Sequence, residues 1–340
     1  MVNSMGGNAL SFETKRLSKD EYFELQHLVL DNLQHNTVGC QFKPVDAYYS
    51  KETFGDLDIV WTSDRTSISN IIDIVRNVFD PKDIVRNGSV ISFDVNDFQV
   101  DLIYSKSDEV LFSINYFAWN DLGNFIGRTA HRLGFKYGHD GLKYVMRDED
   151  DPSYVISEVF LTKDHDEALE FLGFSSHDHA MGFDTPEEIF EYAATSPYFS
   201  PASFVLSNRN HIARVRDRKR KMYNACVEYY KEKFGVDDNT PVEPLDKAAH
   251  LVRAFDKFPS FYEAYTSVMA KHIKHKAYKS VFNGKTVGAI FSVEGKELGA
   301  KMKTLREFFE AFNLQDFVTS LSDTEFEKFV LMLEETGKLN

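Results

Sequence analysis

The sequence predicts an α+β protein, in which a mixed sheet with flanking helices is followed by an all-helical C-terminal region. Two observations lead to this fold class. In the first half of the chain, short β-branched and aromatic segments alternate with segments of helical periodicity. After the charged run 147–152, the apolar spacing is helical almost throughout. A chain of 340 residues is also long enough for two or three domains, each with its own core.

Helices and strands are expected to alternate in the N-terminal part. The first helix, over 18–35, has Ser18 as a candidate N-cap and Glu21 three residues later, which is the spacing of a capping box. Further helices are expected over 68–78 and 120–133, the second ended by Gly134. Strands are expected at 57–61, 90–93, 98–104 and 111–116, with a hairpin turn at Asn96-Asp97 between the middle two.

The charged run 147–152 is the predicted domain boundary, because it interrupts the apolar pattern. The helices expected beyond it are 164–172, 186–194, 213–233, 244–255, 261–281, 297–312 and 323–336. We therefore expect three domains: an α+β domain over 1–148, a small helical linker over 149–208, and a basic helical region over 209–340.

Composition excludes several classes of protein. Apolar residues make up 43% of the chain, which is typical of a globular protein and too high for a disordered one. No run approaches the roughly 20 apolar residues of a membrane span, so no membrane partner is expected. The two cysteines, Cys40 and Cys226, are far apart, which favours a reducing compartment and a cytoplasmic location.

Charge is unevenly distributed along the chain. The segment from Arg209 to Lys285 holds 17 Lys/Arg and 9 Asp/Glu, a net charge of +8. Since the whole chain carries −14, the remainder carries −22. One basic surface on an acidic body is typical of a protein that binds nucleic acid, although solvated helix faces without a partner would produce the same counts.

Three aspartates form the strongest motif in the sequence. Asp56 and Asp58 are two residues apart in an expected strand, so their side chains point to the same face of the sheet. Asp101 stands alone within a second apolar strand. Should the two strands be neighbours, the three carboxylates converge on one site. The alternative is that Asp56 caps a turn after Gly55 and that Asp101 lies at a sheet edge.

Converging carboxylates repel one another unless a cation lies between them. Their hard oxygen ligands suit Mg²⁺ or Mn²⁺. Two such ions on a shared set of carboxylates are the arrangement used for phosphoryl transfer from nucleoside triphosphates. The three aspartates are thus both the expected metal ligands and the expected catalytic residues.

The segment Lys-Glu-Thr-Phe-Gly-Asp-Leu-Asp, residues 51–58, followed by Asp101 on a later strand, resembles the polymerase-beta superfamily of nucleotidyltransferases. Its nearest likeness is to family X DNA polymerases, over residues 38–145. The resemblance implies that the α+β domain is a polymerase-beta-type catalytic core. It also implies nucleotide-binding roles for Ser50, Lys51, Gly55, Tyr116, Phe117, Asp121, Asn124 and Arg128, the last two at the base or the template strand.

The chain departs from this family pattern in three places. The Gly-Ser pair expected before the aspartates is absent, and Gly39-Cys40 is the nearest substitute, six residues further upstream than usual. Tyr48 and Tyr49 replace expected arginines, and Trp119 replaces an expected glycine.

The C-terminal segment 282–305 resembles the tail of bacterial CCA-adding and poly(A)-adding enzymes, which faces RNA. Gly295 and Gly299 would let a helix N-terminus approach a backbone phosphate, or would equally serve a tight helix–helix contact. The nucleic-acid-binding residues we expect here and in the basic run are Arg214, Arg218, Lys221, Lys276, Lys279, Gly295, Lys296 and Gly299.

The expected function is transfer of a nucleoside monophosphate from an NTP such as ATP to the 3′-hydroxyl of a nucleic acid, with release of pyrophosphate. An RNA acceptor is favoured, as in tRNA processing. Three alternatives stay open: a template-directed DNA polymerase, nucleotidylation of a protein or small molecule, and a nucleic-acid-binding protein without catalysis. A minor hypothesis, a metal phosphohydrolase, rests on His165-Asp166 and His177-Asp178-His179.

Overall fold

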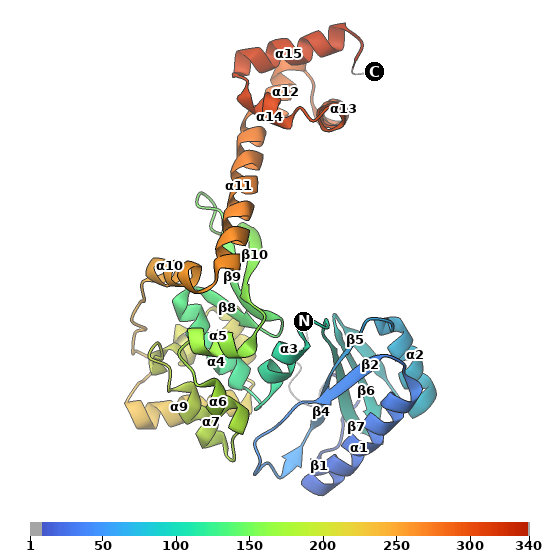
Figure 1. Ribbon diagram of the computed structural model, residues 1–340, viewed down its shortest axis with the longest axis vertical. Coiled ribbons are helices and arrows are strands. Elements are labelled where there is room, and N and C mark those ends of the chain that lie inside the picture. Colours follow the sequence, from blue (N-terminus) through green and yellow to red (C-terminus); the bar gives the residue numbers. More distant parts are fainter. Residues whose placement is uncertain (1–8, 339–340) are drawn as a thin grey trace. The chain divides into compact units, whose positions relative to one another are not determined.

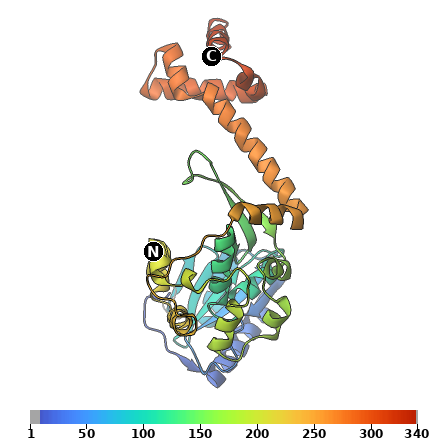
Figure 2. The same ribbon diagram turned by 90° about the vertical axis from the view of Figure 1, so that its left-hand side faces the viewer.

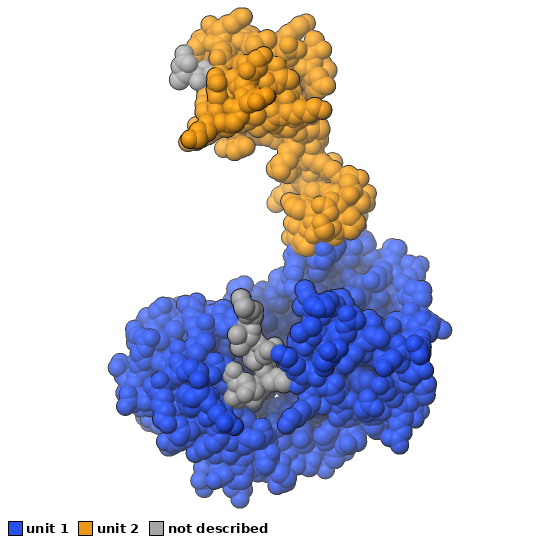
Figure 3. Space-filling model, turned by 180° about the vertical axis from the view of Figure 1, so that it is seen from behind, with its two compact units in different colours: residues 1–147, 158–261 blue, residues 148–157, 262–340 orange. Residues whose placement is uncertain are grey.

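A computed structural model describes residues 9–338. The protein is α+β and divides into two compact units (Figure 3). Unit 1 comprises residues 1–147 and 158–261, and unit 2 comprises residues 148–157 and 262–340. These units differ from the expected ranges 1–148, 149–208 and 209–340, because the chain leaves unit 1 near residue 148 and returns to it ten residues later. Among the described residues, no helix has the length and apolar character needed to cross a lipid bilayer.

A five-stranded mixed sheet in the order β2-β4-β7-β6-β5 forms the first part of unit 1 (Figure 1). Its strands are β2 (Cys40–Pro44), β4 (Asp56–Ser63), β5 (Ile84–Asn87), β6 (Val90–Val95) and β7 (Phe98–Tyr104). Strands β4 and β7 are parallel, and the other neighbours are antiparallel. A separate two-stranded sheet joins β1 (Leu17–Ser18) to β3 (Thr53–Phe54).

Helices α1 (Lys19–Asn36) and α2 (Ile68–Phe79) pack against one face of this sheet. The core between them contains Val29 and Val75 from the helices, and Leu57, Ile59 and Val100 from the sheet. Side chains alternate along a strand, so the residues between these apolar ones lie on the opposite face. The face that carries Asp56, Asp58 and Asp101 is therefore the face turned away from α1 and α2.

Several local expectations are confirmed. Helix α1 begins with the expected capping box, in which a Glu21 carboxylate oxygen accepts from the Ser18 N–H at 2.8 Å. Strands β6 and β7 form the expected hairpin, and both turn residues are left-handed, with φ of 52° at Asn96 and 64° at Asp97. A two-residue turn of this kind requires positive φ, which Asn and Asp tolerate better than other side chains.

The strand expected at 111–116 is wrong, because the segment forms helix α3 (Val110–Phe117). A short run that is mostly apolar has no periodicity to separate strand from helix. Here the following helix, α4 (Leu122–Leu133), packs against α3, and Gly123 lies so close to the Tyr116 carbonyl that a Cβ would meet that oxygen at 2.2 Å.

The rest of unit 1 is a three-stranded sheet with surrounding helices. The strands are β8 (Phe135–Gly138), β9 (Gly141–Arg147) and β10 (Val155–Thr162), in the order β10-β9-β8. The helices are α5 (His165–Phe171), α6 (Ser176–Met181), α7 (Pro186–Ala193), α8 (His211–Asp217), α9 (Lys221–Phe234) and α10 (Lys247–Lys257), with 3₁₀ turns at Pro201–Ser203 and Leu206–Asn208. The expectation of an all-helical region beyond residue 148 is therefore wrong at β10, whose β-branched residues extend the sheet begun by β8 and β9.

The continuous helix expected over 213–233 is also wrong, since α8 and α9 are separated at Arg218–Arg220. The amide nitrogen of Asn224 donates to the carbonyl oxygens of Arg218 at 3.0 Å and Arg220 at 2.6 Å. These bonds satisfy two carbonyl groups at the break. Asp217, the last residue of α8, is fully buried and accepts from Arg209 at 2.7 Å and from Arg216 at 2.8 Å.

Unit 2 is built on the long helix α11 (Pro259–Val281), which begins in unit 1. Four helices gather at its C-terminal end (Figures 1 and 2): α12 (Gly284–Phe291), α13 (Gly295–Ala311), α14 (Gln315–Ser320) and α15 (Asp323–Glu335). Their core contains Phe282, Phe309 and Phe326. The hairpin tip 148–157 belongs to this unit because Asp148 accepts from His272 at 2.7 Å and from Lys276 at 3.2 Å.

The buried ion pair in unit 1 leads to a first prediction. Asp217→Asn should lower the free energy of unfolding by about 3–5 kcal/mol, because it leaves the buried Arg209 guanidinium without a charged partner. The matched control is Asp73→Asn, which removes an ion pair at the surface. The Asp73 side chain is 69% exposed and that of its partner Arg76 is 61% exposed. Its effect should stay below about 1 kcal/mol. Urea unfolding of both variants measures the difference, and equal small losses would contradict the structural role of Asp217.

Candidate metal centre

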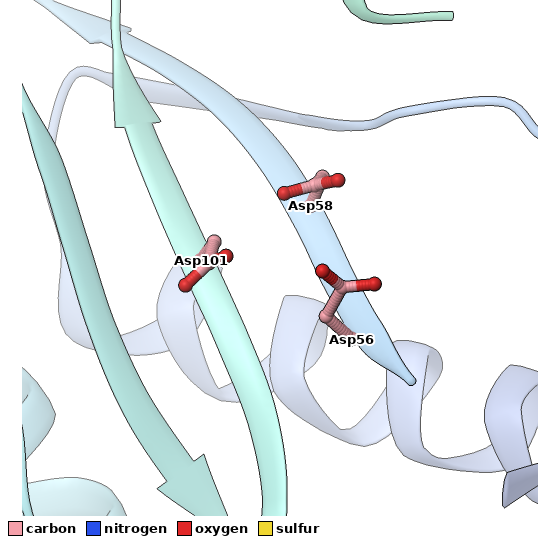
Figure 4. A group of neighbouring side chains, drawn as sticks. All are labelled: Asp56, Asp58 and Asp101. Atoms are coloured by element: carbon pink, nitrogen blue, oxygen red, sulfur yellow. The ribbon is translucent and has the colours of Figure 1, made fainter. Parts of the chain in front are cut away.

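Asp56, Asp58 and Asp101 converge on one site (Figure 4). The parallel register of β4 and β7 places Asp58 directly opposite Asp101, and Asp56 lies two residues earlier on β4. One oxygen from each carboxylate lies within 4.8 Å of the other two. All three come from two adjacent strands, so the sheet itself sets their spacing.

Apolar packing on the other face of the sheet maintains this arrangement. Leu57 and Ile59 flank Asp58 on β4, and Val100 and Leu102 flank Asp101 on β7. All four are fully buried against α1 and α2. Shifting either strand by one residue would bring carboxylates into that core and leave apolar side chains in their place.

Two neighbours on the hairpin hold Asp101. The amide nitrogen of Gln99 donates to both carboxylate oxygens of Asp101, at 3.1 and 2.9 Å. Ser92, opposite Asp101 in the β6–β7 register, also hydrogen-bonds to it. Sequence reasoning missed both residues, although the expected turn at Asn96-Asp97 already implies the pairing of Ser92 with Asp101.

The electrostatics of the site favour a bound cation. Burial raises the pKa of Asp58 well above its usual range, and the nearby charges of Asp56 and Asp101 raise it further. Burial likewise raises the pKa of Asp101 to about 6, and Asp56 adds to that rise, while hydrogen bonds from Ser92 and Gln99 oppose it. A divalent ion would remove this repulsion, because it supplies the positive charge that the carboxylates share.

The spacing of the carboxylates also fits such an ion. Mg²⁺ binds oxygen at about 2.1 Å, so two oxygens on opposite sides of it lie about 4.2 Å apart. The three carboxylate oxygens lie within 4.8 Å of one another, which is close to this value. Three carboxylates without a nitrogen or sulfur ligand are a donor set that suits Mg²⁺ or Mn²⁺.

Lys51 is a cationic neighbour of the carboxylates. Burial lowers the pKa of its ammonium, while Asp56 and Asp58 oppose that decrease, and the nitrogen lies 4.5 Å from the centre of the Phe54 ring. Gly55 is buried between β3 and β4. Ser50, in contrast, bonds to the Asp184 carbonyl oxygen through its N–H at 2.9 Å and through its hydroxyl at 2.6 Å.

The predicted nucleotide-binding residues beyond the sheet lie on α3 and α4. Tyr116 and Phe117 end α3 with their rings in an edge-to-face contact. Asp121 precedes α4 and forms an ion pair with Arg220, while burial raises its pKa. Asn124 and Arg128 follow on α4.

Asn124 and Arg128 also contact the helical part of unit 1. The Asn124 side-chain oxygen accepts from Arg216 at 3.1 Å, and Arg128 donates to the Ser203 carbonyl at 3.0 Å. Arg216 and Arg220 thus belong to the environment of the predicted nucleotide residues. In the sequence, only their position in the basic run indicates a role for these two arginines. That position does not reveal that they contact Asn124 and Asp121.

The predicted nucleic-acid-binding residues fall into two groups. Arg218 and Lys221 are exposed near the break between α8 and α9, and Arg214 is half-buried on α8. Lys276 forms ion pairs with Asp148 and Asp150 of the hairpin tip, so its charge is neutralised within unit 2.

The glycines of the C-terminal tail lie in open space. Gly295 has φ of +56°, a conformation that favours glycine, and begins α13 next to the exposed Lys296. A Cβ on Gly295 or Gly299 would meet no atom within 4 Å. A tight helix–helix contact is therefore not the reason for either glycine. Gly284 and Gly288, in contrast, lie near Leu298 of α13, which a Cβ would meet at 3.8 Å and 3.6 Å.

His165 and His179 lie in the interior of unit 1. Their rings are 4.7 Å apart, and His165 is 2.8 Å from the Tyr137 hydroxyl. Burial lowers the pKa of His165 to about 3 and that of His179 to about 4, so both are neutral at physiological pH. Across residues 9–338, the one group of three or more potential metal ligands is the aspartate triad, which leaves the phosphohydrolase hypothesis without a ligand set.

Comparison of the chain with protein-family models and with curated protein sequences finds no match.

The raised pKa of Asp101 leads to a second prediction. A carboxyl whose folded-state pKa lies above its ordinary value favours folding when protonated, so this favourable contribution is lost as pH rises from 3.8 to about 6. In chelator-treated protein, the free energy of unfolding should therefore decrease over this interval. Mn²⁺ should restore stability at the upper end, because the ion binds the ionised carboxylates.

Urea titrations at several pH values, with chelator or with Mn²⁺, measure this effect. Asp101→Asn should make the decrease smaller, leaving the part that Asp58 contributes, and should abolish the response to Mn²⁺. Asp97→Asn, in the exposed turn before β7, makes the same chemical change outside the triad and should retain both. A Mn²⁺ response that survives in Asp101→Asn would contradict a metal centre at these residues.

Proposed function

We propose that this protein is a metal-dependent nucleotidyltransferase that transfers a nucleoside monophosphate from an NTP to the 3′-hydroxyl of a nucleic acid. The observation that carries the proposal is the convergence of Asp56, Asp58 and Asp101 from two adjacent parallel strands. The resemblance of residues 38–145 to family X DNA polymerases supports the same reaction class.

In the proposed reaction, the 3′-oxygen forms a bond to the α-phosphorus of the NTP. The bond between that phosphorus and the oxygen bridging to the β-phosphate breaks, pyrophosphate leaves, and the hydroxyl proton passes to water. Divalent ions held by the triad would make the hydroxyl more acidic and neutralise charge on the phosphates.

The chain's own residues would position these groups. Asp56 and Asp58 would hold both ions, and Asp101 would complete the site nearer the hydroxyl. Gln99 and Ser92 would keep the Asp101 carboxylate in one orientation through their hydrogen bonds. Lys51 would contribute a cation beside Asp56 and Asp58, where the triphosphate approaches.

The α3–α4 segment would receive the nucleoside. Tyr116 and Phe117 offer aromatic surface, and Asp121 and Asn124 offer polar groups already oriented by Arg220 and Arg216. An apolar body with a few oriented polar groups is the usual composition of a small-molecule site.

An RNA acceptor is favoured because the segment 282–305 resembles the RNA-facing tail of CCA-adding and poly(A)-adding enzymes. The open surroundings of Gly295 and Gly299 support this preference, since a nucleic-acid backbone could approach α13 closely there. The exposed Arg218 and Lys221 would add electrostatic attraction for the same partner.

The third prediction tests catalysis. Asp58→Asn should reduce pyrophosphate release by about a thousandfold or more, because the ions lose a shared ligand. Binding of the nucleic acid should remain. Asp97→Asn is the matched control and should retain activity. Full activity in Asp58→Asn would refute the mechanism, and equal loss in both variants would point to general damage to the sheet.

The fourth prediction tests the acceptor. With Mg²⁺ and each labelled NTP or dNTP, the protein should extend a tRNA that lacks its 3′ end and should leave a gapped DNA duplex unextended. Gel separation of the labelled products measures both reactions in parallel. Template-ordered extension of the DNA alone would replace the RNA preference with a DNA-polymerase activity.

A further inference from the structure

A cavity of about 550 Å³ lies within unit 2, between the end of α11, the start of α12 and the middle of α13. His275, Lys279 and Arg306 contribute cationic or titratable groups to its lining, while Tyr278, Phe282 and Met302 contribute apolar surface. The lining includes no acidic residue. Its chemistry is therefore suited to an anion that carries an apolar or planar group.

The basic side chains of the cavity differ from two other lysines of unit 2. Lys274 pairs with Asp316, and Lys301 pairs with Glu334. Within residues 9–338, the side chains of Lys279 and Arg306 take part in neither a hydrogen bond nor an ion pair. Both are exposed at the cavity, so their charges are available to a ligand.

Tyr278 contributes its ring to the lining. Its hydroxyl is buried and, in the described part of the chain, has no hydrogen-bond partner. Burial raises the pKa of Tyr278 to about 12; Arg306 opposes this rise and Glu310 adds to it, so the hydroxyl stays protonated at physiological pH. A buried donor without a partner is unfavourable in the free protein, and it leaves the ring of Tyr278 as the part of this side chain that a ligand in the cavity can contact.

The start of α12 provides a third favourable element. Gly284, the first residue of this eight-residue helix, lines the cavity, and the Asn283 side chain caps the helix by accepting from the Thr286 N–H at 2.9 Å. The positive end of the helix dipole therefore faces the same space as Lys279 and Arg306. Phosphate groups bind readily where a helix N-terminus and basic side chains meet.

The volume exceeds what a free phosphate needs. Cavities of about 300–1,000 Å³ accommodate small organic ligands. The ring of Tyr278 and the flexible side chain of Met302 offer a surface for a planar base, and bases stack readily on aromatic side chains. A base in a duplex is stacked between its neighbours, so only an unpaired base could enter.

We propose that this cavity binds one nucleotide of a single-stranded nucleic acid, with the phosphate at Lys279, Arg306 and His275 and the base against Tyr278 and Met302. This binding site is separate from the aspartate triad and does not require the triad to be catalytic.

The fifth prediction tests this site in the whole protein, in chelator-containing buffer so that catalysis plays no part. Fluorescence anisotropy would follow a labelled oligoadenylate, with its deoxy counterpart in a parallel arm to identify the preferred sugar. Lys279→Gln and Arg306→Gln should each weaken binding about tenfold, because each removes a charge-assisted contact to phosphate. Lys274→Gln, on the same helix but paired outside the cavity, is the matched control and should bind like the wild type.

Tyr278→Phe separates binding from folding. It should leave the free energy of unfolding equal or higher, because it removes an unsatisfied buried hydroxyl, and it should retain binding, because the ring that contacts the base remains. NMR of protein labelled at the methionine methyl groups should show the Met302 signal, assigned with Met302→Leu, moving when the oligonucleotide is added.

Two results would overturn the proposal. One is equal affinity of Lys279→Gln, Arg306→Gln and Lys274→Gln for both oligonucleotides. The other is an oligoglutamate that competes as well as the oligonucleotide, which would mark a general anion site. In Asp58→Asn, oligonucleotide binding at the cavity should persist, so that failure of the catalytic proposal and failure of this one can be told apart.

Discussion

The parallel pairing of β4 with β7 is the interaction on which the candidate centre depends. It places Asp58 opposite Asp101 while directing Leu57 and Val100 into the core beneath α1 and α2. The same alternation that buries the apolar face therefore gathers the carboxylates on the other face. Folding this sheet brings like charges together in a partly desolvated place, which is unfavourable without a cation. Burial of the apolar face stabilises the sheet and offsets this repulsion. The site is therefore maintained by residues that take no part in its chemistry.

A second electrostatic arrangement organises the helical part of unit 1. Counted along the chain, the segment that includes α8 and α9 is strongly basic, but part of this charge is neutralised internally. Arg209 and Arg216 share the buried Asp217, and Arg220 pairs with Asp121 beside Tyr116. These contacts connect the basic run to the predicted nucleotide-binding segment. The arginines thus have a structural role in orienting that segment, and the surface available to a polyanion is smaller than the sequence count indicates.

Unit 2 shows the same division between structural and available charge. Its hairpin tip is attached to α11 through Asp148, which takes up the charge of Lys276. Lys279, one helical turn away, lines a cavity together with Arg306 and Tyr278. Of two neighbouring lysines on one helix, one can therefore be ion-paired and the other available to a ligand, depending on which residues the fold brings beside them. Each candidate site thus gathers charged groups of one sign: the three carboxylates in unit 1, and the basic side chains around the cavity in unit 2.

Features that depend on neighbours along the chain could be predicted from the amino-acid sequence. The spacing of Asp56 and Asp58, the capping box of α1 and the hairpin turn at Asn96-Asp97 are encoded within a few residues, and local backbone preferences suffice to form them. Three other features depend on tertiary contacts: β7 lies beside β4, residues 111–116 are helical, and Asp121 contacts Arg220. These outcomes join segments far apart in the sequence, and their free energy comes from burial and charge pairing that no local pattern records.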